Sequence, residues 1–256
     1  MLSRDRPGAT HEFKTIAWKC LIAVFLGSTQ IGCFATAIGD PLHQSDWKGF
    51  NFGPSEQVRV CTWRDYGVSA TEVQDWLEAW NTKHEEQVGL TVVPIDKGEL
   101  PRNGFTHTAI TDSFEKQVPL TDDCDRDMYF VGRNVGDFLF GVLAVTTLPL
   151  AETLGETDDQ TLTHAFVVER NATLMNFVFS PAAITEHEIW RWLGCKQHYD
   201  WDRCYPQIAM LKMQEASLKE TGYFKRIGEQ PFYSTWDNLS DHLLVSRAEV
   251  NSRRPH

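Results

Sequence analysis

The alternation of apolar and polar residues along the chain predicts a domain that contains both strands and helices. Residues 58–63 alternate with a period of two, which is typical of a strand, and residues 70–86 carry apolar side chains at helical spacing. The capping pattern that starts at Ser69 precedes this helix, and residues 89–95 predict a second strand. Because the connections are short, we expect a β-α-β unit with parallel strands.

The same pattern predicts further elements along the rest of the chain. They are a helix over residues 106–117, a buried strand over 127–132, a strand over 162–168 and a helix over 202–217. Residues 136–143 fit either a helix or an apolar loop. The order of elements predicts a mixed α/β (α+β) fold.

A capped helix after residue 179 is the most informative stretch of the sequence. Ser180 is a good N-cap, and Pro181 suits the first helical position, where its missing N–H costs nothing. Gly194 enters the left-handed conformation freely, so we expect the helix to end and the chain to turn there.

The residues His187-Glu188-x-x-Arg191-x-x-Gly194-x-x-x-His198 on this helix resemble the zinc motif of the metzincin peptidases. The resemblance implies that His187 and His198 bind zinc together with a third, unidentified ligand. It also implies that Glu188 is the catalytic general base that takes a proton from metal-bound water.

The sequence departs from the family motif in two places. Arg191 replaces the second zinc ligand, and a guanidinium cannot donate a lone pair to a metal. His198 lies one residue beyond the usual third position, where a loop could still bring it to the metal. Cys204 resembles a feature of the archaemetzincin-like branch, and Met210 or Met213 is a candidate for the methionine beneath the metal.

The resemblance also carries expectations about the fold. It implies a metzincin-like mixed sheet with a long active-site helix, an edge strand that pairs with extended substrate, and a smaller, loop-rich C-terminal part. We expect the metzincin-like domain to cover residues 57–217, after a lead segment at 38–56, and a loop-rich tail to follow at 218–256.

Three functions follow from these observations. The first is an exported zinc-dependent metallopeptidase that hydrolyses peptide bonds in a peptide or protein substrate, with Arg191 impairing the site. The second is a catalytically inactive relative that binds peptides or proteins, in which Arg191 pairs with Glu188 in place of the metal. The third is an unrelated disulfide-bonded binding domain, for which the His-Glu pair is an accident.

Composition and the N-terminal sequence indicate which partners and which compartment to expect. The chain has 256 residues and a formal net charge of −11, so its surface repels phosphates and nucleic acid is not an expected partner. Residues 1–37 have a basic start, a short apolar run and a small-residue cleavage site, which indicate an export signal. Cys33 is a candidate for a lipid anchor.

The cysteines that remain after export agree with an oxidising compartment. Cys61, Cys124, Cys195 and Cys204 allow three pairings, and we favour Cys195 with Cys204, across a short loop, and Cys61 with Cys124. The rival interpretation places Cys195 and Cys204 on a metal with His198.

Two glycosylation tripeptides begin at Asn171 and Asn238. They matter only if the chain passes through a eukaryotic secretory pathway.

Overall fold

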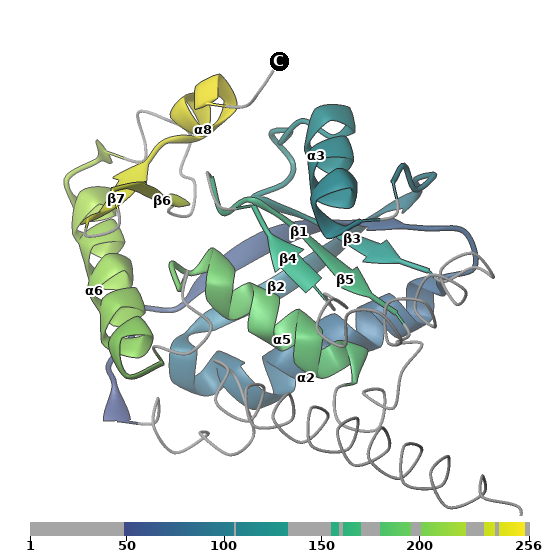
Figure 1. Cartoon of the computed structure of the whole chain (residues 1–256). Helices are drawn as coiled ribbons and strands as arrows, with labels where there is room; N and C mark the ends of the chain where they lie inside the picture. Colours follow the sequence, from purple (N-terminus) through teal and green to yellow (C-terminus); the bar gives the residue numbers. More distant parts are fainter. Residues whose placement is uncertain are drawn as a thin grey trace, which may run out of the picture.

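A five-stranded mixed sheet with helices on both faces forms the body of the protein (Figure 1). The computed structural model describes residues 49–104, 106–132, 155–158, 161–169, 180–195, 201–223, 233–238 and 241–253. The strand order in the sheet is β2-β1-β3-β5-β4, and the first four strands are parallel while β4 is antiparallel to β5. The predicted mixed α/β fold class is confirmed.

The N-terminal β-α-β unit has the predicted parallel pairing. Its parts are β1 (Glu56–Arg64), α2 (Ala70–Val88) and β2 (Leu90–Glu99). The hydroxyl of Ser69 accepts the N–H of Glu72 at the helix start, and Gly89 ends the helix with φ of +66°. Strand β2 continues beyond the predicted residues 89–95, because Asp96, Gly98 and Glu99 still pair with β1.

Two more parallel strands and one antiparallel strand complete the sheet. They are β3 (Arg126–Val131), which follows α3 (His107–Gln117), and β5 (His164–Val168), which pairs with β4 (Gly155–Thr157). Leu162 was expected in the strand, but its φ of +55° places it in the preceding turn. The sequence pattern did not predict β4, which has only three residues.

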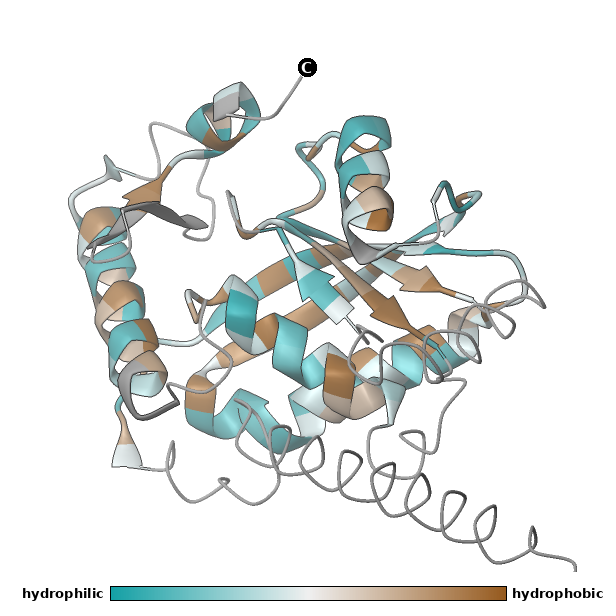
Figure 2. Ribbon diagram, viewed as in Figure 1, coloured by the Kyte–Doolittle hydropathy of each residue, from teal (hydrophilic) through white to brown (hydrophobic). Residues whose placement is uncertain are grey.

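The core divides into two layers around the sheet. The larger layer contains Leu77 and Trp80 of α2 and Ile189 and Trp190 of α5 (Pro181–Trp192), with Trp80 and Trp190 in edge-to-face contact at 5.1 Å between ring centroids. Helix α3 packs on the opposite face. Figure 2 shows β5 as largely hydrophobic and β4 as largely hydrophilic, which agrees with the position of β4 at the edge.

The outer edge of β2 is held by the helix beside it. The side-chain amide of Asn81 accepts the N–H of Val92 at 2.8 Å and donates to its C=O at 2.9 Å, as a neighbouring strand would. Pro94 lies two residues on and has no N–H to offer a further strand. Helix α2 therefore closes this edge.

The described C-terminal part contains two helices and a hairpin. Helix α6 (Trp201–Glu220) is followed by the hairpin of β6 (Tyr233–Asn238) and β7 (Asp241–Val245), and then by α8 (Arg247–Arg253). The guanidinium of Arg247 donates to Asp125 at 3.0 Å, and Asp125 also accepts two hydrogen bonds from the Arg59 side chain. These contacts attach α8 to the end of the sheet.

Several predictions fall on residues outside the described ranges. They are the export signal at 1–37, Cys33, the segment 136–143, Asn171 and His198. Asn238 ends β6. In the part of the chain that is described, no helix is long and apolar enough to cross a membrane.

Candidate functional site

The motif helix forms where the sequence predicts it. In α5 the Ser180 hydroxyl accepts the N–H of Ala183 at 3.2 Å, and Pro181 occupies the first turn. The helix ends at Trp192, and Gly194 follows with φ of +113°. Local capping chemistry therefore sets both ends of the helix that carries His187, Glu188 and Arg191.

The side chain of Glu188 is buried where α5 packs against the edge strand β4. Its side chain is 1% exposed, and the Thr157 hydroxyl donates to its Oε2 at 2.5 Å. A Cβ at Gly155 would lie 2.7 Å from Glu188 Oε1, which is closer than real Cβ contacts. Glycine at position 155 is thus what lets β4 pass over the carboxylate.

Arg191 lies beside Glu188, one turn along the helix. One guanidinium nitrogen is 3.4 Å from Glu188 Oε2, and the other donates to the backbone C=O of Thr157 at 3.5 Å. Both side chains are buried, so the pair is screened little by water. The guanidinium supplies the positive charge that the carboxylate needs at this depth.

The described residues of the motif do not fit a zinc ion. His187, on α5, is partly buried, and the ligand position one turn later holds Arg191, which has no lone pair to give. His198 lies outside the described residues. The structure therefore describes two of the motif's ligand positions, and of these His187 has a lone pair for a metal and Arg191 does not. The roles of His187 and His198 as ligands and of Glu188 as general base stay predictions.

The methionines expected beneath a metal lie elsewhere. Met210 is 43% exposed and Met213 is 49% exposed on α6, so that expectation is wrong.

Glu186 is a second buried acid on α5 that the sequence pattern did not single out. It faces α2, where Lys83 donates to Oε1 at 2.6 Å and His84 Nε2 lies 3.2 Å from Oε2. His187 therefore stands between two buried carboxylates that face different elements. The sequence pattern did not indicate that Glu186 would contact α2.

The four cysteines form the disulfides Cys61–Cys124 and Cys195–Cys204, the pairing expected from the sequence. Disulfides of this kind are typical of proteins outside the cytoplasm. The rival interpretation of Cys195 and Cys204 as metal ligands does not hold in this state, because their sulfurs are bonded to each other.

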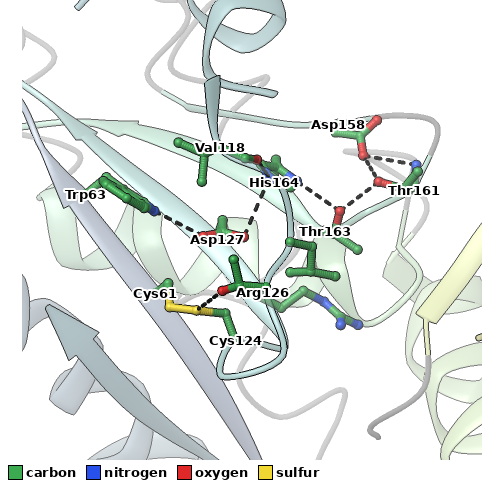
Figure 3. Close-up of polar contacts among 12 residues, drawn as sticks. Cys61, Trp63, Val118, Cys124, Arg126, Asp127, Asp158, Thr161, Thr163 and His164 are labelled. Carbon is green, nitrogen blue, oxygen red and sulfur yellow. Dashed lines mark hydrogen bonds and ion pairs between the residues drawn. A yellow bond between two sulfur atoms is a disulfide. The ribbon is translucent and has the colours of Figure 1, made fainter. Parts of the chain in front are cut away.

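A row of buried polar side chains crosses the sheet beside the first disulfide (Figure 3). Cys61 of β1 is in register with Asp127 of β3, which is in register with His164 of β5. Trp63 Nε1 donates to Asp127 Oδ1 at 3.0 Å, and His164 Nε2 lies 3.6 Å from Asp127 Oδ2. The sequence pattern marked these strands as buried but did not indicate that their polar residues meet.

The row continues from His164 into the turn before β5. Nδ1 of His164 is 2.9 Å from the Thr163 hydroxyl, which is 2.7 Å from that of Thr161, and Thr161 donates to Asp158. Nε2 of His164 lies 2.9 Å from the backbone carbonyl oxygen of Val118, so both ring nitrogens of this buried histidine have a polar partner.

A separate pocket of about 490 Å³ lies where β1 and β2 end. Its lining includes Asp65, Tyr66 and Arg102, and the ring of Tyr66 is 85% exposed. The opposite charges of Asp65 and Arg102 lie 3.9 Å apart. No residue of the α5 motif lines this pocket among those described.

Comparison with known proteins finds likenesses among solved structures. No protein-family model and no curated protein matches the chain. The crystal structure of metalloproteinase-II from Bacteroides fragilis aligns with 60% of this chain at 14% sequence identity and a TM-score of 0.36. The aligned part spans 50% of that chain's length.

Proposed function

We propose that this protein is a non-catalytic, metallopeptidase-like protein that binds extended peptide segments along the outer edge of β4. The observation that carries the proposal is the buried pair of Glu188 and Arg191. A general base has to reach the proton of a water molecule, whereas Glu188 is 1% exposed and faces Thr157, Gly155 and Arg191. The guanidinium occupies the position of a ligand and neutralises the acid.

The backbone of β4 supports the peptide-binding part of the proposal. The N–H of Asp158 donates to the C=O of His164 at 2.8 Å, and bonded and non-bonded pairs alternate along an antiparallel ladder. Glu156 is therefore the next residue bonded to β5, and the N–H and C=O groups of Gly155 and Thr157 point outward. An extended peptide gains main-chain hydrogen bonds at such an edge.

Contacts on both faces of β4 hold this edge in place. Thr157 contacts Glu188 on the side of α5, and Glu156 accepts a hydrogen bond from Thr111 of α3 at 3.0 Å on the other side. Arg191 also donates to the C=O of Thr157, so that carbonyl is already partly occupied. Thr157 is 1% exposed and Gly155 is half-buried, so a bound peptide would use chiefly the N–H and C=O groups of Gly155.

Metal content and hydrolysis test the non-catalytic part. We expect the purified, disulfide-bonded protein to contain no stoichiometric zinc and to leave fluorescein-labelled casein intact. Arg191→His restores the missing imidazole, and we expect this variant to take up zinc. One zinc ion per natural chain that is lost in His187→Ala, together with hydrolysis that is lost in Glu188→Gln, would instead establish an active peptidase.

Peptide affinity for the edge tests the binding part. The probe is fluorescein-labelled, oxidised insulin B chain, followed by fluorescence anisotropy. Hydrogen–deuterium exchange then locates the contact, and we expect exchange of the Gly155 N–H to slow when the peptide is bound. Exchange at Gly155 that bound peptide leaves unchanged would place the peptide elsewhere.

A further inference from the structure

We propose that the reduced protein binds one Zn²⁺ ion through Cys61, Cys124 and Asp127, at a site that the disulfide replaces on oxidation. The proposal concerns the first disulfide and is independent of the motif on α5. It rests on how the sheet brings these three side chains together.

The strand register places the three ligands at one point. Cys61 of β1 is the direct neighbour of Asp127 of β3, so both side chains point to the same face of the sheet. Cys124 precedes β3 by two residues and meets Cys61. The two sulfurs and a carboxylate oxygen of Asp127 all lie within 4.8 Å of one another. Small shifts bring such atoms to the zinc distances of about 2.0–2.3 Å.

The surroundings of Asp127 resemble the outer shell of a metal site. Trp63 donates to one carboxylate oxygen at 3.0 Å, and His164 lies 3.6 Å from the other. Groups that hold a ligating carboxylate in one orientation in this way strengthen metal sites. Two thiolates and a carboxylate, with water as a fourth ligand, make a tetrahedral set suited to Zn²⁺.

Zinc binding leaves the net charge of the cluster unchanged. In the oxidised protein the Asp127 carboxylate faces the His164 ring at 3.6 Å. A dithiol such as dithiothreitol gives two electrons and two protons to the disulfide and becomes a cyclic disulfide itself, leaving two thiols on Cys61 and Cys124. Zn²⁺ then replaces the two thiol protons, so the ion and two thiolates add no net charge to the buried cluster.

The site is enclosed in the folded protein, so the ion has to enter before folding is complete. Cys61 and Cys124 are at most 1% exposed, beneath Leu120, Val245 and Val250. Because Val250 belongs to α8, the ion is bound while the reduced chain folds, before α8 docks.

Zinc content of refolded protein tests the proposal. The full chain without residues 1–37 is refolded under anaerobic conditions with dithiothreitol and ZnSO₄, desalted, and assayed for zinc with a chelating dye. The oxidised protein is the blank. We expect one additional zinc ion in the reduced chain. Cys61→Ser/Cys124→Ser should lose it, whereas the matched variant Cys195→Ser/Cys204→Ser should retain it.

Asp127→Asn tests the third ligand without removing a cysteine. We expect this variant still to form both disulfides when oxidised, which shows that it folds, and to bind zinc at least about tenfold more weakly when reduced. Co²⁺ in place of Zn²⁺ should give sulfur-to-metal charge-transfer absorption that the Cys61→Ser/Cys124→Ser variant lacks. No extra zinc in the reduced protein, or zinc that persists without Cys61 and Cys124, overturns the site. Unchanged affinity in Asp127→Asn overturns the three-ligand assignment.

Discussion

Two buried clusters of charge tie helices to the sheet, and they differ in what can titrate. On α5, Glu188 faces Arg191 and the Thr157 hydroxyl. On α6, Lys212 and Lys219 face two carboxylates, Glu56 at the start of β1 and Glu215. Lys212 lies 2.7 Å from Glu56, and Lys219 lies 2.5 Å from Glu215.

The difference between the clusters is whether a buried group can change its protonation state with pH. A guanidinium stays protonated in proteins, so the α5 pair keeps its charges. In the α6 cluster, burial and then the repulsion of Glu56 raise the pKa of Glu215 to about 8. Burial is the largest single effect on Glu56 and acts to raise its pKa, but Lys212, Lys219 and a hydrogen bond with Glu215 together lower that pKa. This cluster can therefore take up a proton where the α5 pair cannot.

Arg191→Met should have the largest effect, because it leaves the buried carboxylate of Glu188 without a counter-charge. We expect the free energy of unfolding to fall by about 3–5 kcal/mol. Urea unfolding followed by tryptophan fluorescence measures it. The double variant Glu188→Leu/Arg191→Met removes both charges and should recover most of the loss. A double variant as unstable as the single one would show that the guanidinium acts through packing alone.

Lys212→Met should cost less than Arg191→Met, although its side chain is only 1% exposed. Lys219 remains beside both carboxylates, and Glu215 can bind a proton, so we expect a loss of about 2–3 kcal/mol at neutral pH. The loss should grow at pH 9, above the Glu215 pKa of about 8, where the two acids repel each other without Lys212. The same urea titration at the two pH values measures it, and a loss independent of pH would contradict a change of protonation in this cluster.

The stability of the natural protein should depend on pH through Glu215. Its folded pKa of about 8 lies above the ordinary value of 4.5, so the folded state binds more protons between these values. The contribution of Glu215 to the free energy of unfolding is therefore fully present below about pH 4.5. It is lost as the pH rises through about 8, and it amounts to a few kcal/mol, as an order of magnitude. Thermal unfolding between pH 5 and 9 measures the slope. Glu215→Gln should flatten it.

Thr157→Val should have the smallest effect on stability. It removes the hydroxyl that donates to Glu188 at 2.5 Å but leaves the charge of Arg191 in place. We expect a loss of about 1–2 kcal/mol, and Thr157→Ser, which keeps a hydroxyl, should lose about half of that or less. Calorimetric unfolding compares the two. Equal losses would mean that the methyl group of Thr157, not its hydroxyl, stabilises the site.

Local rules in the sequence predicted much of the fold. Ser69 and Ser180 mark the starts of α2 and α5, and the apolar repeat of α2 gave its buried face. The short β-α-β connections predicted parallel strands, which the structure confirms. These features depend on neighbours within a few residues, which a single sequence displays.

The remaining features depend on contacts between distant residues. Strand β4 has three residues, too few for a period of two to be visible, and it forms because β5 pairs with it. Glu188 and Arg191 are three residues apart, so the sequence suggested that they could pair. Thr157, which also contacts Glu188, lies 31 positions away in the sequence and could not be predicted. The meeting of Asp127 with His164 likewise depends on the register of β3 and β5.

The Asn81 side chain that clasps Val92 limits how molecules of this protein can associate. A filament that grows by edge-to-edge strand pairing needs an open edge strand on both sides of the sheet. Each added molecule then offers a further open edge to the next molecule. Here α2 and Pro94 block the first half of the β2 rim, so contact through β4, which joins one molecule to a second, is the favoured edge pairing. Edge-to-edge association of the folded protein would consequently yield symmetric pairs rather than filaments.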